Sequence, residues 1–209
     1  LKIIVDGGWM MIPLMVESVI ALGVVLDRAV SFWRLNQVDT RSLRAQVMQL
    51  IREDRVQEAA LLCAQTPNPV SAVLLAGIQA FDRHRSISEK RDLAATVRTA
   101  MEEFAVHAIS AVEKRFSVMV TIGNSAPLLG MTGTVVGMIM SFDQLSQGGG
   151  NAAKVAAGIS VALITTAAGL LIAMLAVLPY NYFMSLSSQV DLEIEECKTQ
   201  FIDFITTGV

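Results

Sequence analysis

Three long apolar runs stand out along the chain, at residues 9–26, 116–142 and 155–183. A helix that crosses a bilayer needs about 20 mostly apolar residues, so each run is a candidate membrane span. The second and third runs carry no charged residue, and the first carries only Glu17. The first run follows no basic segment and precedes no small-residue cleavage site, so we expect a membrane helix there and not a signal peptide. Because the chain begins with Leu1, we expect it to start just inside the natural terminus.

The remaining residues follow a helical pattern. Apolar residues recur at spacings near three and four over 42–64, which predicts one helix that the prolines at 67 and 69 end. A second helix is predicted over 70–81. From about Ser88 no helix-breaking residue occurs before Gly123, so the next helix is predicted to run directly into the second apolar run. The tail over 187–206 has one apolar stripe and is predicted to continue the third run as a helix.

The composition places these helices in a membrane. Hydrophobic residues make up 53% of the chain and charged residues 17%, whereas a soluble domain is about one quarter charged. Of the 16 lysines and arginines, 13 lie between positions 28 and 115 and one more is Lys198. The positive-inside rule makes that side cytoplasmic, so three crossings put the N-terminus outside and the C-terminus inside. The net charge of −3 offers no basic excess for nucleic acid.

The predicted fold is an all-α integral membrane protein with three transmembrane helices, the second and third extended into a cytoplasmic helical bundle. Six segments follow from this prediction: the outer N-terminal end with the first transmembrane helix (1–33), a cytoplasmic helical domain (34–115), the second transmembrane helix (116–142), an outer loop (143–154), the third transmembrane helix (155–186) and a cytoplasmic C-terminal helix (187–209).

Small residues and hydroxyls form a stripe along each of the last two spans. Close helix packing is expected at five glycines, namely Gly130, Gly133, Gly137, Gly158 and Gly169. Five hydroxyl residues are candidates for an ion pathway or lumen, namely Thr134, Thr165, Thr166, Ser141 and Ser160. The pattern fits two interpretations equally well. Either the hydroxyls bond back to their own tightly packed helices, or they line a narrow lumen or a groove that receives another helix.

Titratable groups are missing where a proton-coupled protein needs them. No Asp, Glu, Lys, Arg or His lies in 116–142 or in 155–190. A proton-coupled device normally needs an ionisable group inside the membrane, so the group would come from Glu17 or from a partner. An isolated acid in an apolar run is costly, and Glu17 could lie against a hydroxyl of a neighbouring helix.

The two stripes resemble the signature spans of the ExbB/TolQ/MotA family, and the ExbB/TolQ branch most closely. The second span reads A-P-L-L-G-M-T-G-T-V-V-G-M over 126–138. The third reads G-I-S-V-A-L-I-T-T-A-A-G-L over 158–170 and ends in P-Y-N at 179–181. The first span also resembles that branch, with Asp27-Arg28 as its acid–arginine end.

The resemblance implies a homo-pentameric ring in the bacterial inner membrane, with a periplasmic N-terminus and the second and third spans lining its centre. It implies two single-span partners of the ExbD/TolR type inside the ring, each supplying an aspartate that carries the ion. A TonB/TolA-like protein is a possible further partner. Ion flow would then drive mechanical work for energised transport or envelope function. The family's lumen threonines correspond to Thr134 and Thr166.

One position departs from the family pattern. ExbB and TolQ sequences carry a glutamate in the third span where this chain has Val161. The acid is therefore dispensable here, or the ion differs, or the chain belongs to another branch such as a gliding motor. Adjacent hydroxyls at Thr165 and Thr166 could coordinate sodium. We expect protons first and sodium second.

Other classes fit less well. A self-contained channel or transporter would need its own ion-binding acid or broken helices at mid-membrane depth. An enzyme would need a nucleophile with a base or a metal set, and His84 and His107 lie in the predicted cytoplasmic domain, where we expect them to be surface residues. Cys63 and Cys197 form neither a disulfide framework nor a metal site, and we expect both to stay reduced in the cytoplasm. We therefore expect no catalytic residue, no metal and no cofactor. A purely structural scaffold would tolerate valine at the threonines.

Overall fold

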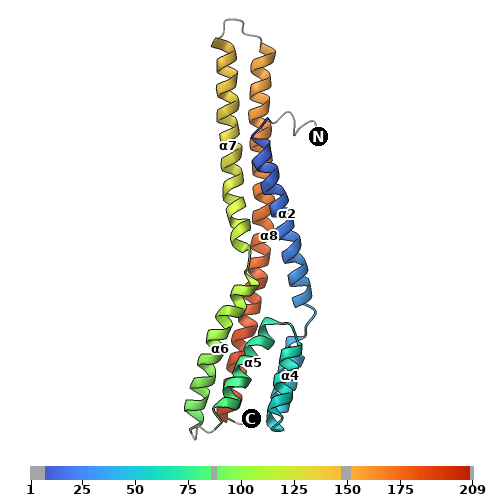
Figure 1. Cartoon of the computed structure of the whole chain (residues 1–209), viewed down its shortest axis with the longest axis vertical. Coiled ribbons are helices and arrows are strands. Elements are labelled where there is room, and N and C mark those ends of the chain that lie inside the picture. Colours follow the sequence, from blue (N-terminus) through green and yellow to red (C-terminus); the bar gives the residue numbers. More distant parts are fainter. Residues whose placement is uncertain (1–7, 86–88, 147–151, 208–209) are drawn as a thin grey trace. The chain divides into compact units, whose positions relative to one another are not determined.

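The computed structural model describes residues 8–85, 89–146 and 152–207 (Figure 1). The described residues are almost entirely α-helical, which confirms the predicted all-α class. The helices are α2 (Met11–Leu35), α3 (Thr40–Arg52), α4 (Val56–Gln65), α5 (Pro69–Arg83), α6 (Lys90–Val112), α7 (Phe116–Ser146) and α8 (Ala152–Thr207). Helix α8 runs without interruption through the predicted third span and the predicted tail.

The chain forms two compact units. The first unit combines the residues up to Ala29 with Arg115–Tyr182, and the second combines Val30–Lys114 with Phe183–Val209. In the first unit, α7 lies beside the N-terminal half of α8, with α2 packed on the pair (Figure 1). Their shared core is small, with Leu14, Ala21, Ala126 and Ala176 almost fully buried. Many of the large aliphatic side chains of this unit are exposed instead, among them Ile12, Val19, Leu128, Val135, Leu163 and Leu171.

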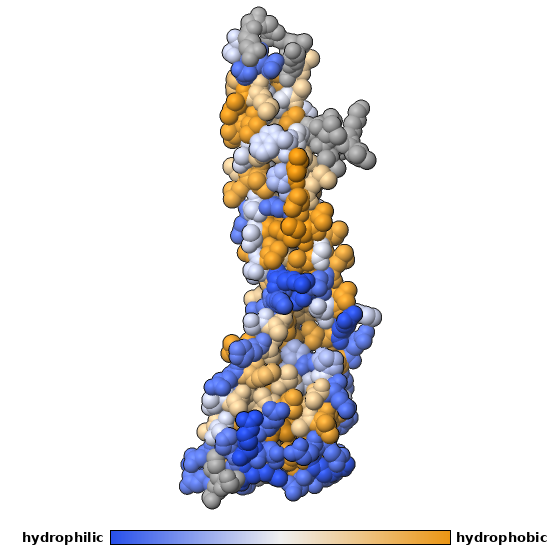
Figure 2. Space-filling model, viewed as in Figure 1, coloured by the Kyte–Doolittle hydropathy of each residue, from blue (hydrophilic) through white to orange (hydrophobic). Residues whose placement is uncertain are grey.

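Two helices are long and apolar enough to cross a membrane among the residues that the structure describes. They are α7 and the α8 segment Val155–Thr207, and in each only 28% of the most apolar window is buried inside the chain. Large aliphatic side chains cover the outside of α7 and α8, as Figure 2 shows in orange. Helix α2 contains the predicted first span. It is not one of these two helices, because its first 18 residues include three charged residues, Glu17, Asp27 and Arg28.

The second unit is a helical bundle with an ordinary hydrophobic core. Helix α5 packs against α4 and α6, and the C-terminal part of α8 completes the core. Val47, Leu74, Met101, Ile194 and Phe201 are fully buried there. The apolar stripe predicted along the tail thus faces the helices of the predicted cytoplasmic domain.

Local capping explains where two of these helices begin. The Asp39 carboxylate accepts from the backbone N–H groups of Arg41 at 3.0 Å and Ser42 at 3.4 Å, at the start of α3. These bonds lower the pKa of Asp39, with the Ser42 bond the largest cause. At the start of α5, the Asn68 side chain accepts from the Val70 N–H at 2.8 Å, and Pro69 occupies the first helical position, where its missing N–H costs nothing.

Two predicted helices are broken where the sequence holds neither glycine nor proline. The helix predicted over 42–64 stops at Arg52 and restarts at Val56, with Asp54 in the left-handed region at a φ of 62°. Asp tolerates this conformation better than most residues, because its short polar side chain can hydrogen-bond locally. The N–H groups that follow bond back to the last turn of α3, including Arg55 to the Leu50 carbonyl at 2.9 Å.

The second break corrects the prediction that α6 continues into the second span. Helix α6 runs from Lys90 to Val112, and its predicted start near Ser88 lies outside the described residues. Arg115 has a φ of 73°, and α7 starts afresh at Phe116. A residue in left-handed conformation ends the ladder of helical hydrogen bonds before α7, so α6 and α7 are separate helices. The other predicted extension, from the third span into the tail, is present in α8.

Candidate functional site on helices α7 and α8

The five predicted packing glycines lie along the contact between α7 and α8. A Cβ atom placed on Gly133 would lie 2.5 Å from Thr165 Oγ1, and one on Gly169 would lie 2.5 Å from the Ala126 carbonyl oxygen. A Cβ atom on Gly137 would come within 2.9 Å of Ala162 Cβ. The two backbones are therefore so close at these positions that only glycine, which has no Cβ atom, fits without a shift. Gly130 and Gly158 lie in the same contact, against the Thr166 backbone and the Ser141 side chain respectively.

The neighbouring threonines Thr165 and Thr166 have different surroundings. Thr165 is fully buried between the helices, and its hydroxyl donates to the carbonyls of Val161 at 3.0 Å and Ala162 at 2.9 Å. Thr166 is half-buried, and its hydroxyl crosses to α7, where it donates to the Gly130 carbonyl at 3.1 Å. Thr165, and not Thr166, shares the buried face of Ala162, Gly169 and Ala173.

The other three candidate hydroxyls divide in the same way. Thr134 is half-buried and donates to the Met131 carbonyl of its own helix at 2.6 Å. Ser141 is buried and donates to the Gly137 carbonyl at 2.9 Å and, across the pair, to the Val155 carbonyl at 3.3 Å. Ser160 is exposed on α8. Ser160 is thus exposed, Thr134 and Thr166 are half-buried, and Thr165 and Ser141 lie inside the pair.

The acid of the first apolar run is bonded to α7. Glu17 Oε1 accepts from the Ser125 hydroxyl at 2.6 Å. Its second oxygen, Oε2, is buried and has no hydrogen-bond partner in the structure. Val161, at the position of the family glutamate, is half-buried, and its side chain is apolar.

A charged cluster at the end of the apolar segments was not predicted. Asp27 Oδ2 lies 2.6 Å from Arg28 Nη2 and 2.9 Å from Arg115 Nη1. The cluster joins α2 to the residue in left-handed conformation that precedes α7. The sequence signal was the charged dipeptide at the edge of each run, Asp27-Arg28 after the first and Lys114-Arg115 before the second. Their pairing could not be read from the sequence, because the residues are almost 90 positions apart.

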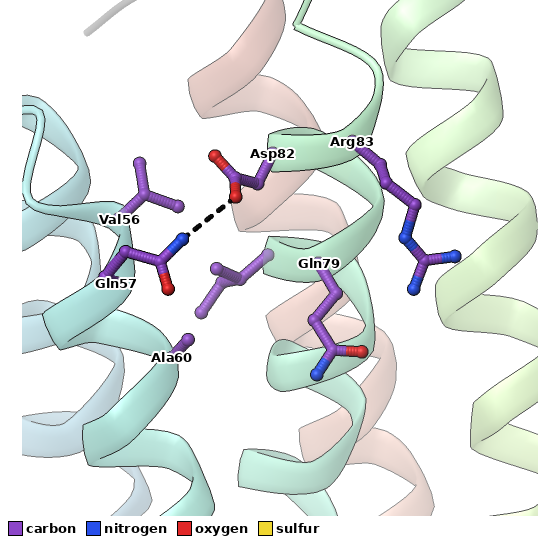
Figure 3. Close-up of a pocket in the computed structure, with 7 residues that line it drawn as sticks. Val56, Gln57, Ala60, Gln79, Asp82 and Arg83 are labelled. Atoms are coloured by element: carbon purple, nitrogen blue, oxygen red, sulfur yellow. Dashed lines mark hydrogen bonds between the residues drawn. The ribbon is translucent and has the colours of Figure 1, made fainter.

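A cavity of about 210 Å³ lies in the second unit, between α4 and α5 (Figure 3). Gln57 Nε2 donates to Asp82 Oδ2 at 3.0 Å across it, while the Gln79 and Arg83 side chains border it from α5. None of the predicted site residues lines this cavity. The hydroxyl and glycine contacts of α7 and α8 are therefore the stronger candidate for function.

Comparison with known proteins agrees with the resemblance in the two spans. A family model described as the MotA/TolQ/ExbB proton channel family matches residues 65–196. Two proteins of Synechocystis, each named as a putative biopolymer transport protein, are similar over most of their length. ExbB-like 1 is 36% identical, covering 88% of this chain and 70% of its own, and ExbB-like 3 is 31% identical, covering 86% and 82%. The biopolymer transport protein ExbB of Pseudomonas putida is 26% identical, covering 78% of this chain and 50% of its own.

Proposed function

Because this chain belongs to the MotA/TolQ/ExbB proton channel family, we propose that it is the ring-forming subunit of an ion-driven motor in the bacterial inner membrane. The family is one of membrane proteins that take part in transport, and not one of enzymes. In the proposed motor, five copies surround two single-span partners of the ExbD/TolR type. The ion, a proton, flows along the ring's inner wall and drives mechanical work of the partners for biopolymer transport or envelope function.

The observation that carries this proposal is a pair of apolar helix segments that hold hydroxyls but no acid. Helices α7 and α8 carry an exposed Ser160 and a half-buried Thr134 and Thr166, while positions 116–142 and 155–190 contain no Asp, Glu, Lys, Arg or His. A proton-coupled protein normally needs an ionisable group in the membrane, so a partner helix would supply it. The subunit would then be a wall along which a partner's carboxyl group moves.

The proposed wall has two layers. Thr134, Thr166 and Ser160 would offer hydroxyl oxygens to the ion pathway from the outer side of the α7–α8 pair. Thr165 and Ser141 would support it from inside, because their hydroxyls bond carbonyls within the pair. Each Thr166 hydroxyl donates to the Gly130 carbonyl and keeps its oxygen lone pairs as acceptors.

The proposed topology has three crossings. Helix α2 would cross as well, with its charged Asp27–Arg28 end at the cytoplasmic boundary, where the chain's basic residues gather. The N-terminus would then be periplasmic, and the bundle of α3–α6 with the end of α8 would be cytoplasmic. Trp9 and Trp33, both exposed, would lie at the two interfaces, where tryptophan is enriched.

A sodium-driven or gliding-motility stator of the same superfamily is the alternative that Val161 favours. With hydrocarbon at the glutamate position, the ion pathway of this subunit would depend on hydroxyls, which also suit sodium. Flux measured with proton and with sodium gradients separates the two ions.

The proposal is tested by purifying the full chain from its native membrane and identifying what accompanies it. We expect a small companion chain that has a periplasmic domain and one membrane helix bearing an aspartate. Native mass spectrometry should count five copies of this chain and two of the companion. In liposomes, ion flux should require that companion. Rapid flux through the chain alone would contradict the proposal and favour a self-contained channel.

A further inference from the structure

The contact between Glu17 and Ser125 is unlike the other hydroxyl contacts of α7. Thr121, Thr132 and Thr134 donate to backbone carbonyls of their own helix, at 2.8, 2.8 and 2.6 Å. Ser125 instead donates to a carboxyl oxygen of another helix, at 2.6 Å. A serine in a helix ordinarily finds an acceptor one turn back, so this hydroxyl has exchanged a local bond for a bond to α2.

The surroundings of Glu17 are apolar. Its neighbours one turn away on α2, Leu14 and Ala21, are fully buried in a cluster with Ile122 and Ala126 of α7. Facing α7 and α8 carry no Asp, Glu, Lys, Arg or His over 116–142 and 155–190. On α2 itself the nearest charges are Asp27 and Arg28, about 15 Å along the helix axis. Among the residues that the structure describes, no cation is therefore available to compensate a charge on Glu17.

The second carboxyl oxygen, Oε2, indicates whether the protonated or the ionised form of Glu17 fits the contact. Oε2 is buried without a hydrogen-bond partner, and an unpaired buried polar atom is costly, more so when it shares a full negative charge. A proton on Oε2 removes that charge and leaves Oε1 as the acceptor for Ser125. A metal cation is a poor substitute, because a hard cation takes about six oxygen ligands and the contact offers one carboxyl and one hydroxyl.

We propose that Glu17 and Ser125 form a proton-binding site inside each subunit, at the contact of α2 with α7. The Glu17 carboxyl holds a proton on Oε2, releases it to water when the contact opens, and recovers it from water when the contact closes. Ser125 stabilises both forms through Oε1, and the ionised form more, because hydrogen bonds to charged groups are stronger. The site lies within one chain and needs no partner aspartate, so it goes beyond the proposed motor function.

The test uses a hydrophobic carbodiimide, dicyclohexylcarbodiimide, on the purified full chain in lipid nanodiscs. This reagent adds the O–H of a protonated carboxyl across its C=N bond to give an O-acylisourea. In an apolar site this product rearranges by O-to-N acyl migration to a stable N-acylurea, which peptide mass spectrometry locates. We expect labelling of Glu17 that falls as the pH rises, and no labelling of the exposed Glu102 and Glu103 of α6. Glu17→Gln should abolish the adduct.

Ser125→Ala separates a proton site from a merely structural carboxyl. Loss of the hydroxyl removes more stabilisation from the ionised form, so the pH of half-maximal labelling should rise by about one unit. Thr121→Val is the matched control, one turn earlier on α7 with a hydroxyl bonded to its own helix, and it should leave that pH unchanged.

Three outcomes would overturn the proposal: no labelling of Glu17 at any pH, labelling that does not depend on pH, or an unchanged midpoint in Ser125→Ala. Protection by sodium chloride but not by potassium chloride would also contradict it, since the pair would then bind sodium. All of these readouts are independent of the companion chain, so a motor without this site and a site without the motor give different results.

Discussion

Thr134 and Thr166 are both half-buried, yet their hydroxyls bind differently. Thr166 joins α8 to α7 through the Gly130 carbonyl, whereas Thr134 bonds within α7. Interhelical hydrogen bonds in membrane proteins contribute about 0.6 kcal/mol on average. The stability of the helix pair therefore depends little on either hydroxyl, and a large functional effect would have to come from the ion pathway.

Thr166→Val and Thr134→Val should each reduce ion-driven work severalfold while the ring stays assembled. Valine keeps the shape of threonine and removes the hydroxyl, so Thr166→Val should lower the unfolding free energy by about 1 kcal/mol or less, and Thr134→Val by less still. Ion flux into liposomes that contain the companion chain measures the ion current that drives the work. Thermal unfolding in detergent measures the stability of the variants. Undiminished flux in both variants would reject the pathway role and favour a scaffold.

At the scale of elements, the α7–α8 contact depends on having no side chain at five positions. Gly133→Leu should separate the helices and disrupt assembly, because even its Cβ atom would meet the Thr165 side chain at 2.5 Å. Overpacking of this kind costs about 1–3 kcal/mol or more. Size-exclusion chromatography and thermal unfolding measure the result.

Gly23→Leu is the control for that variant. A Cβ atom on Gly23 of α2 meets nothing within 4 Å in the chain, so the same substitution should leave the folded subunit as stable as before. A Gly133→Leu protein that unfolds at the same temperature as Gly23→Leu would show that the close approach is dispensable.

The break between α3 and α4 allows a test of backbone strain. Asp54 has a φ of 62°, which glycine adopts freely and a β-branched residue does not. Asp54→Gly should be more stable than Asp54→Val by about 1–2 kcal/mol. Both variants lose the ion pair of Asp54 with Arg85, so the comparison isolates the backbone. Equal thermal midpoints would show that the left-handed conformation is not maintained in solution.

At the scale of the whole molecule, the second unit brings together the chain's two cysteines in one core. Cys63 of α4 and Cys197 of α8 are both free and buried in the same cluster. Burial raises the pKa of the Cys63 thiol to about 11 and that of the Cys197 thiol to about 12. The reactive thiolate is therefore depleted in the folded protein.

Alkylation of both thiols by iodoacetamide should be slow at pH 8 and should accelerate after unfolding. With a pKa of about 11, only about one Cys63 thiol in a thousand is ionised at pH 8, compared with about one in four at an ordinary pKa of about 8.5. The rate should rise about tenfold per pH unit until the pKa is reached. Rapid alkylation of the native protein would contradict the burial of these side chains.

The sequence by itself determined the helical class, the positions of the apolar runs and the absence of acids from two of them. These follow from composition and from a period near 3.6 residues, which are properties of the chain alone. Only the tertiary structure decided that Thr165 is buried against α7 while Thr166 is half-buried. Adjacent residues differ by about 100° around a helix, and a stripe of small residues is too wide to choose between them.

The breaks at Asp54 and Arg115 and the pairing of Glu17 with Ser125 were likewise decided by the fold. Neither break has glycine or proline, and the paired residues are 108 positions apart. A non-glycine residue adopts a left-handed conformation only when its surroundings stabilise it, and a side-chain contact forms only when packing places two helix faces together. Both conditions depend on the assembled structure, so the sequence suggested a hydroxyl near Glu17 but could not say which one.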